Sequence, residues 1–219
     1  MPARFKKRGF FEDFDDTRPY SGFEVALWNA ACATERREPT GYGASGDPAF
    51  THIQVLPREG IVYGSDKYVA VEARFGKDPG GCDPFLISVA ALKAVWESKI
   101  GMNGISLKVS NQGETYVQCS DSIRIFAARD VKFLPLSKIF DPIFGDDMVV
   151  CPMVVRPDMF RKLGRLYARG LNVETVRKLP KNDDRDCTNY NSYLRVTWPA
   201  GRAVVVGMRD DEAVGWRRR

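Results

Sequence analysis

IQVLPREGIVYGSDKYVAV, residues 53–71, is the stretch of the sequence whose pattern indicates the fold most directly. Apolar and polar residues alternate before Pro57, and β-branched and aromatic residues resume at Ile61. The segment Arg58-Glu59-Gly60 lies between these runs and has the composition of a turn. Such runs separated by a glycine turn are typical of neighbouring antiparallel strands. We therefore expect strands at residues 51–57, 61–64 and 68–75.

Helical patterns occur on both sides of this hairpin. After Ser21, apolar residues recur every three to four positions, which predicts a helix that begins near that serine. A second pattern of the same period follows Ser88, which we expect to cap the helix. The side chains expected in the core are Phe23, Leu27, Ala30, Ala31 and Thr34 from the first helix, and Val89, Leu92, Val95 and Trp96 from the second.

The order of strand, helix and two or three antiparallel strands recurs along the chain. Copies are expected at about residues 4–75, 84–140 and 148–209. In the third copy, Pro157 stands in the first turn of a helix and Gly170 ends it. Because helices lie between antiparallel strands, the pattern predicts an α+β fold. Further strands are expected at residues 85–87, 105–109, 115–119, 123–126, 149–155, 173–178, 193–198 and 203–208, and a connecting segment at 133–140.

Composition excludes several classes of protein. Of the 219 residues, 44% are hydrophobic and 28% are charged, and the formal net charge is +5, which is typical of a globular chain rather than a disordered one. No apolar run reaches the roughly 18 to 20 residues that a membrane span needs. We expect neither a signal peptide nor a membrane association.

Cysteine and histidine do not form the patterns of the common metal and redox sites. The five cysteines include no C-x-x-C pair, which argues against a zinc ribbon or a redox couple and favours reduced thiols in a cytoplasmic protein. The single histidine, His52, lies in an apolar context and is interpreted as structural. We expect no metal and no cofactor.

The third helix has the most distinctive distribution of charge. On a helical projection, one side carries Arg161, Lys162, Arg165 and Arg169. The other side carries Met159, Phe160, Leu163, Leu166 and Tyr167, which we expect to be buried. A cationic helix face suits the phosphate backbone of nucleic acid, which attracts Lys and Arg without sequence readout. The alternative is an ordinary solvated face.

The first two helices offer weaker candidates for DNA contacts. Their cations are Arg36, Arg37, Lys93 and Lys99. Acidic neighbours such as Glu35 and Glu97 reduce the local charge, so that ordinary surface is the alternative here. Residues 211–219 end in three arginines and are expected to form a basic C-terminal tail.

Four stretches, taken in order, resemble segments of the bacterial DNA sliding clamp, the DNA polymerase processivity factor. Residues 53–71 are similar to a clamp hairpin, and residues 85–96, FLISVAALKAVW, to the segment that ends in Leu-Lys. Residues 133–140, FLPLSKIF, occupy the place of the segment that closes a clamp domain. Residues 154–166 and 193–209 resemble the final half-domain. The short clamp-like proteins of bacterial viruses are the most similar members.

The resemblance implies a DNA-clamp fold, in which strand–helix–antiparallel-strand units repeat and the helices lie on one face of curved sheets. It implies an N-terminal arm or first strand at 1–20, a clamp-like domain of two half-units at 21–143, a second domain with one half-unit at 144–210, and the tail at 211–219. Clamps are not enzymes. They bind double-stranded DNA without regard to sequence, close head to tail into a homo-oligomeric ring, and bind peptides of a DNA polymerase and a clamp loader.

The resemblance also implies a peptide-binding pocket. The hairpin would contribute Ser65, Lys67, Tyr68 and Val69, the connecting segment Pro142 and Ile143, and the last strand Val206, Met208 and Arg209. A flexible methionine beside apolar walls suits varied ligand peptides. Burial in an ordinary core is the alternative for Val206 and Met208. Gly207 stands where the family has proline.

The number of half-units leaves the assembly open. We count three, whereas two full domains need four, and a ring of twelve units would be four chains of three or three chains of four. The count therefore allows a tetramer, a trimer or no ring. An alternative function is a clamp-derived interaction protein that mimics or inhibits a host clamp or loader, or acts as a transcription coactivator.

A third hypothesis is an enzyme that acts on nucleic acid. The pairs Asp146-Asp147 and Asp183-Asp184 have the carboxylates that Mg²⁺ prefers. Both pairs lie in expected loops without further ligands, so that solvated turns are favoured.

Overall fold

The structure is a computed structural model. It describes residues 22–34, 48–76, 82–97, 105–109, 114–120, 122–128, 131–151, 153, 155, 157–168, 170–178 and 192–207. No helix among these residues is long and apolar enough to cross a membrane. The expected N-terminal arm or first strand at 1–20 and the tail at 211–219 lie outside the described residues.

Two of the expected helices form where their patterns predict them. The helices are α1 (Gly22–Cys32), α2 (Val89–Glu97), α3 (Ser137–Ile143) and α4 (Pro157–Leu163), with a short 3-10 helix η2 at Pro48–Thr51. Every side chain expected in the core from α1 and α2 is buried. The hydroxyl of Ser88 accepts a bond of 3.4 Å from the backbone N–H of Ala91, which confirms the expected cap of α2.

The strands form one large antiparallel sheet and one small one. The large sheet has the order β4-β1-β2-β3-β11-β10-β9-β8, and the small sheet has the order β5-β6-β7. The bounds are β1 His52–Leu56, β2 Ile61–Ser65, β3 Val69–Arg74, β4 Phe85–Ser88, β5 Ser106–Val109, β6 Thr115–Gln118, β7 Arg124–Phe126, β8 Met148–Val150, β9 Asn172–Lys178, β10 Ser192–Trp198 and β11 Gly201–Val206. Mixed antiparallel strands and helices confirm the α+β class.

The large sheet continues across the first and third units of the chain. β3, which ends the first unit, pairs with β11, which ends the third, and Val71 lies opposite Ala203 in this pair. β4, from the second unit, pairs with β1 at the other end of the sheet. A single bridge between Leu86 and Ala128 connects β4 to the chain just beyond β7.

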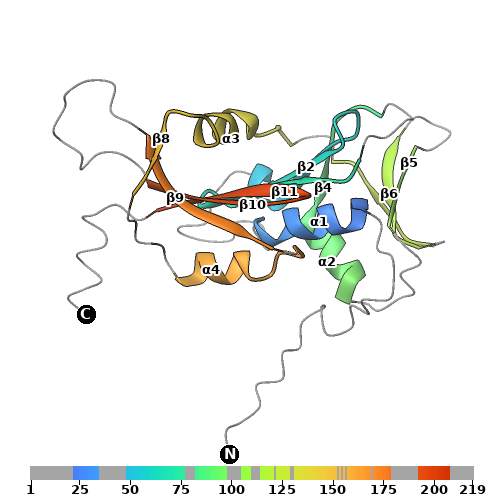
Figure 1. Cartoon of the computed structure of the whole chain (residues 1–219). Helices are drawn as coiled ribbons and strands as arrows, with labels where there is room; N and C mark the ends of the chain where they lie inside the picture. The colour runs from blue at the N-terminus through green and yellow to red at the C-terminus, as the bar shows by residue number, and fades with distance from the viewer. Residues whose placement is uncertain are drawn as a thin grey trace, which may run out of the picture.

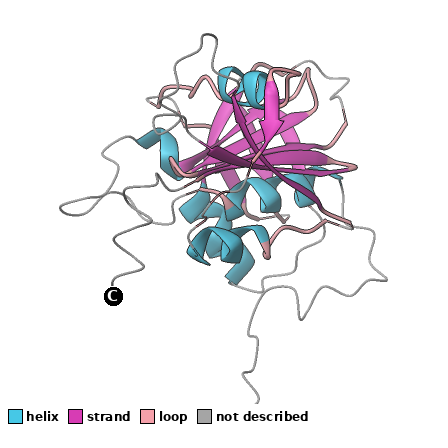
Figure 2. Cartoon of the chain, turned by 60° about the vertical axis from the view of Figure 1, so that its left-hand side comes forward, coloured by secondary structure: helices cyan, strands magenta, loops and turns pink. Residues whose placement is uncertain are grey.

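The two faces of the large sheet carry different helices. α1, α2 and α4 lie on one side and α3 on the other (Figure 1), and a second view shows helices on both sides of the strands (Figure 2). The main core lies on the side of α1, α2 and α4. A smaller core, centred on Phe140, lies under α3. We call the side of the sheet that carries α1, α2 and α4 the helix face, and the side that carries α3 the connector face.

Three elements differ from their predictions. The strand expected at 149–155 is only three residues long, and Val150 in it is 78% exposed. The connecting segment at 133–140 contains the start of α3, which the sequence pattern did not predict. The third helix was expected to reach residue 169 but ends at Leu163. The chain turns there, with the N–H of Arg165 donating to the carbonyl of Lys162 over 3.1 Å.

α1 lies so close to β2 that one position of the strand has no room for a side chain. A Cβ atom on Gly64 would overlap the carbonyl oxygen of Ala30 and lie 2.6 Å from the hydroxyl oxygen of Thr34. This hydroxyl donates to the same carbonyl over 2.8 Å, a local bond at the end of α1. The glycine therefore sets how closely α1 packs on the sheet.

We predict that Gly64→Ala lowers the free energy of unfolding by about 1 to 3 kcal/mol, because an overpacked core must shift backbone to accept the methyl group. Urea denaturation measures this loss. Gly145→Ala is the matched control, since its Cβ would have only ordinary contacts, the nearest being 3.4 Å from the Asp141 carbonyl. Equal stability of the two variants would contradict the close packing of α1.

Candidate functional site

The expected DNA-binding cations that the structure describes lie on the helix face. Arg161 on α4 and Arg165 just after it are exposed, and Lys162 is half-buried. α4 packs on the sheet through Met159 and Leu163, which are buried as expected. Leu166 and Tyr167, also expected to be buried, are half-buried beyond the end of α4.

Phe160 corrects the expected helix projection. It was expected to be buried but is 51% exposed. α4 is only seven residues long, so that its buried stripe is narrower than the projection of a longer helix predicts.

Lys162 differs from the other cations because it has a partner within the protein. Its ammonium group forms an ion pair with the carboxylate of Asp66, which is 4% exposed. Asp66 lies in the turn between β2 and β3, so that the pair joins α4 to the hairpin. The charge of Lys162 is therefore partly neutralised, and Arg161 and Arg165 are the better candidates for phosphate contacts.

α1 holds the segment that carries Arg165. The indole N–H of Trp28 donates to the carbonyl of Arg165 over 3.0 Å. The side-chain amide of Asn29, which is 1% exposed, both donates to the carbonyl of Tyr167 over 3.2 Å and accepts from its N–H over 2.7 Å. These bonds to backbone groups fix the position of the segment and leave the Arg165 guanidinium outside it.

The remaining expected DNA-binding residues contribute less. Lys93 lies on α2 and is half-buried. Arg36, Arg37, Lys99 and Arg169 lie outside the described residues. In the part of the chain that the structure describes, no group of three or more His, Cys, Asp or Glu residues has the arrangement of a metal site.

The expected pocket residues of the hairpin surround a tight turn. The Asp66 carboxylate accepts bonds from the N–H groups of Tyr68 (3.2 Å) and Val69 (2.8 Å). Lys67, which lies between Asp66 and Tyr68, has a φ of 81°, a backbone conformation that residues other than glycine rarely adopt. Ser65 is buried, whereas Tyr68 is 48% exposed and presents its ring to solvent.

Strand alternation places one of the expected pocket residues on the helix face instead of the connector face. Val69 is 2% exposed and belongs to the main core of the helix face. The next residue, Ala70, belongs to the core of the connector face, together with Val204. Because successive strand residues point to opposite faces, Ala70 rather than Val69 accompanies Tyr68 on the connector face. The alternation expected for a strand at residues 68–75 already places Tyr68 and Ala70 on one face and Val69 on the other.

The connector brings two further expected residues to the same face. Ile143 of α3 is buried in the core of that face, and Pro142 is exposed. Val206, on β11, is half-buried, and its N–H donates to the carbonyl of Tyr68 over 2.8 Å. Met208 and Arg209 lie outside the described residues.

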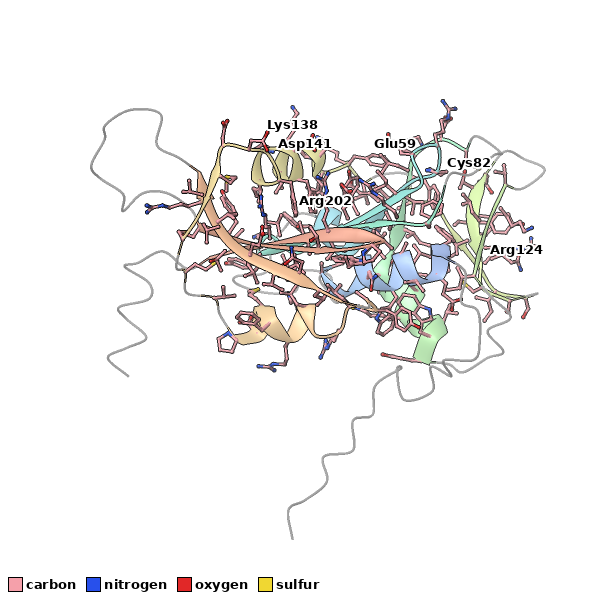
Figure 3. The ribbon with its side chains drawn as sticks, viewed as in Figure 1. Glu59, Cys82, Arg124, Lys138, Asp141 and Arg202 are labelled. Carbon is pink, nitrogen blue, oxygen red and sulfur yellow. The ribbon has the colours of Figure 1, made fainter. Side chains whose placement is uncertain are left out.

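A buried ion pair on the connector face was not anticipated from the sequence. Arg202 on β11 donates to the carboxylate of Glu72 on β3 over 2.7 Å, and Glu72 is 1% exposed. The hydroxyl of Tyr63 donates to the same carboxylate oxygen over 3.1 Å. Figure 3 shows Arg202 between the sheet and α3. Its guanidinium lies 5.1 Å from the ring centroids of both Phe140 and Phe144.

The charges of this cluster support one another. Burial, followed by the negative charge of Glu72, raises the pKa of Tyr63 well above its usual range, so that the phenol stays a donor. Burial disfavours the charged form of Arg202, but its hydrogen bond to Glu72 and the charge of Glu72 outweigh this and raise the pKa of the guanidinium. Arg202 therefore keeps its charge, and its guanidinium contacts both Glu72 of the sheet and the rings of Phe140 and Phe144.

We predict that Arg202→Ala lowers the free energy of unfolding by about 3 kcal/mol, because the buried Glu72 would keep only a longer contact, 3.4 Å, with the exposed Arg74. Chemical denaturation measures the loss. The control is Arg58→Ala, which breaks a pair with Asp83 of nearly the same length, 2.8 Å, but between side chains that are 66% and 85% exposed. That change is expected to cost less than about 1 kcal/mol. Similar losses for the two variants would be evidence against a structural role for the buried pair.

Comparison with known proteins gives likeness at the level of structure only. No protein-family model matches the chain, and no curated protein matches it. The structure is similar to the DNA polymerase III beta subunit of Thermotoga maritima, with 9% identity, a TM-score of 0.49, and 89% of this chain and 66% of that chain covered. The beta chain of DNA polymerase III from Streptococcus pneumoniae TIGR4 gives the same four values.

A putative DNA polymerase III beta subunit from Eubacterium rectale gives 9% identity and a TM-score of 0.47, with 86% of this chain and 62% of that chain covered. The chain thus spans slightly less than two thirds of the length of these structures. Two of these structures are beta subunits of DNA polymerase III, and the third is a putative one.

Proposed function

We propose that this chain is a DNA sliding clamp, a non-enzymatic processivity factor that forms a ring around duplex DNA and tethers a DNA polymerase. The observation that carries the proposal is the gathering of one helix from each repeated unit on a single face of a continuous antiparallel sheet, with exposed arginines beside α4. The resemblance of residues 53–71, 85–96, 133–140 and 193–209 to clamp segments supports the same conclusion.

The helix face would meet the phosphate backbone. Arg161 and Arg165 are exposed there, and their charges attract phosphates and release counterions from the duplex. Such contacts position a protein without reading bases, so that it is free to slide. The hydrogen bonds from Trp28 and Asn29 to the segment after α4 keep Arg165 in place for this contact.

The two ends of the sheet system would join neighbouring subunits. β8 lies at one end of the large sheet and β5 at one end of the small sheet, and each is paired on one side only among the described strands. An edge strand is a template for pairing with another chain. Contact between two different edges is heterologous, and it gives a ring when the rotation closes.

The connector face would bind the polymerase. Tyr68 is exposed beside Val206, and Ile143 and Ala70 lie in the apolar core next to them. An aromatic side chain at the border of an apolar surface is a common anchor for peptides. The same surface would serve a clamp loader in turn.

A second candidate function is that of a clamp mimic that binds a host clamp or its loader. The observation that favours it is the difference between the pair of helices α1 and α2 and the single helix α4. Trp28 of α1 and Trp96 of α2 contact each other with ring centroids 5.0 Å apart. In contrast, Phe160 of α4 is 51% exposed. The exposed side chain of α4 would let the third half-unit pack against a half-unit of another protein as well as against a second copy of this chain.

We predict that Arg161→Glu with Arg165→Glu weakens binding of duplex DNA at least tenfold at low salt and reduces the slope of log affinity against log salt by about 2, because two phosphate contacts are lost. Fluorescence anisotropy at several salt concentrations measures both quantities. Arg58→Glu with Lys138→Glu changes the net charge equally. Lys138 lies on α3, opposite the helix face (Figure 3). Arg58 is exposed in the turn after β1. Equal losses for both double variants would place the DNA contact elsewhere.

We predict that the chain elutes from a sizing column as a trimer or tetramer, with three or four times its mass of 24.6 kDa by light scattering. Val150→Lys is expected to reduce this mass to that of the monomer, because a charge on edge strand β8 opposes pairing. Ile139→Lys is the control, since Ile139 is also exposed but lies on α3 and not on an edge strand. A monomeric wild-type chain that binds a host clamp or loader would instead support the mimic.

A further inference from the structure

The small sheet has an outer face that no described element covers. In the strand register, Lys108 of β5, Tyr116 of β6 and Phe126 of β7 form one row across the sheet. Arg124 lies two residues before Phe126 and therefore points to the same side. The opposite side carries Val117 and Ile125, which are buried in the main core. The row of aromatic and basic residues thus faces outward.

The aromatic and basic side chains of this face contact one another. The rings of Tyr116 and Phe126 have centroids 5.5 Å apart. The guanidinium carbon of Arg124 lies 5.2 Å from the centroid of the Tyr116 ring. Tyr116 is 8% exposed, whereas Phe126 is 51% exposed, so that one aromatic ring supports another that is open to solvent.

The strands of this face carry cations and no acid. Lys108 and Arg124 are exposed, none of the residues of β5, β6 and β7 is acidic, and Glu114, just before β6, is half-buried. Figure 3 shows Arg124 at the border of the molecule, on the side away from α4 and α3. The face is therefore separate from the helix face and the connector face, and it shares only β5 with the strand edges that would join neighbouring subunits.

We propose that this face of the small sheet binds single-stranded nucleic acid without sequence preference. Every base has a flat π-face, and an exposed aromatic ring on an antiparallel sheet is a platform on which a base stacks. Lys108 lies at the β5 end of the row and Arg124 lies beside Phe126 on β7, where they would meet the phosphates next to a stacked base. A duplex is a poorer ligand because its bases are already stacked on their neighbours.

An acidic peptide is the less favoured occupant. Carboxylates would pair with the two cations, but they would leave the exposed ring of Phe126 without a partner. The combination of ring and cations matches a base with its phosphates more completely than it matches a row of carboxylates.

The test uses the full chain and a fluorescein-labelled oligothymidine of about 12 nucleotides, a length within the usual site size of such surfaces. Phe126→Ala is expected to weaken binding roughly tenfold or more, because base stacking is lost. Phe160→Ala is the matched control, since Phe160 is also 51% exposed but lies on α4. It is expected to leave oligothymidine binding unchanged. Phe126→Trp is expected to retain binding, and the fluorescence of its indole to be quenched by a stacked base.

Arg124→Ala provides a second variant that leaves both rings in place, and it is expected to weaken binding and lower the salt dependence. Circular dichroism spectra and thermal denaturation establish that each variant is folded. Unchanged affinity of Phe126→Ala, or equal losses for Phe126→Ala and Phe160→Ala, would overturn the proposal. Equal displacement of the probe by oligoglutamate and by unlabelled oligothymidine would overturn it in favour of an acidic peptide. None of these results depends on ring formation or duplex binding.

Discussion

The ion pair between Glu72 and Arg202 is the interaction on which the arrangement of the sheet depends. It joins β3 to β11, the strands at which the first and third units of the chain meet. A carboxylate that is 1% exposed is costly unless a cation and further donors surround it, and here Arg202 and Tyr63 supply both. A slip of one residue in this register would point Glu72 to the opposite face. The pair therefore favours a single alignment of the two halves.

The same arginine also helps to keep the two faces of the sheet distinct. Its guanidinium packs against Phe140 and Phe144, which keeps the connector and α3 on one side of the sheet. The other side remains available for α1, α2 and α4, which share the main core. Lys162 and Asp66 then connect the two sides, because the ion pair runs from α4 to the turn that presents Tyr68. The proposed phosphate-binding and peptide-binding surfaces would thus be built from the same few strands.

Much of the secondary structure could be predicted from the sequence because it follows local periodicity. The core positions of α1 and α2 and the strands of the first hairpin agree with the structure for this reason. The errors arise where long-range contacts act. α3 is short and contains Pro142, and it is stabilised by burial of its Phe140 and Ile143 in the core of the connector face. α4 ends at Leu163 because Trp28 and Asn29 bind the backbone that follows.

The sequence alone determined that the chain is an α+β protein of repeated units with a basic segment near residues 157–169, because periodicity and charge are properties of neighbouring residues. Only the tertiary structure decided which cations remain exposed and which side of each strand faces the connector. In the tertiary structure, Lys162 pairs with Asp66. Val69 lies in the core of the helix face and Ala70 in the core of the connector face. Tyr116, Phe126 and Arg124 lie together on one face of the small sheet. These outcomes depend on strand register and on contacts between residues far apart in the chain, which no local pattern specifies.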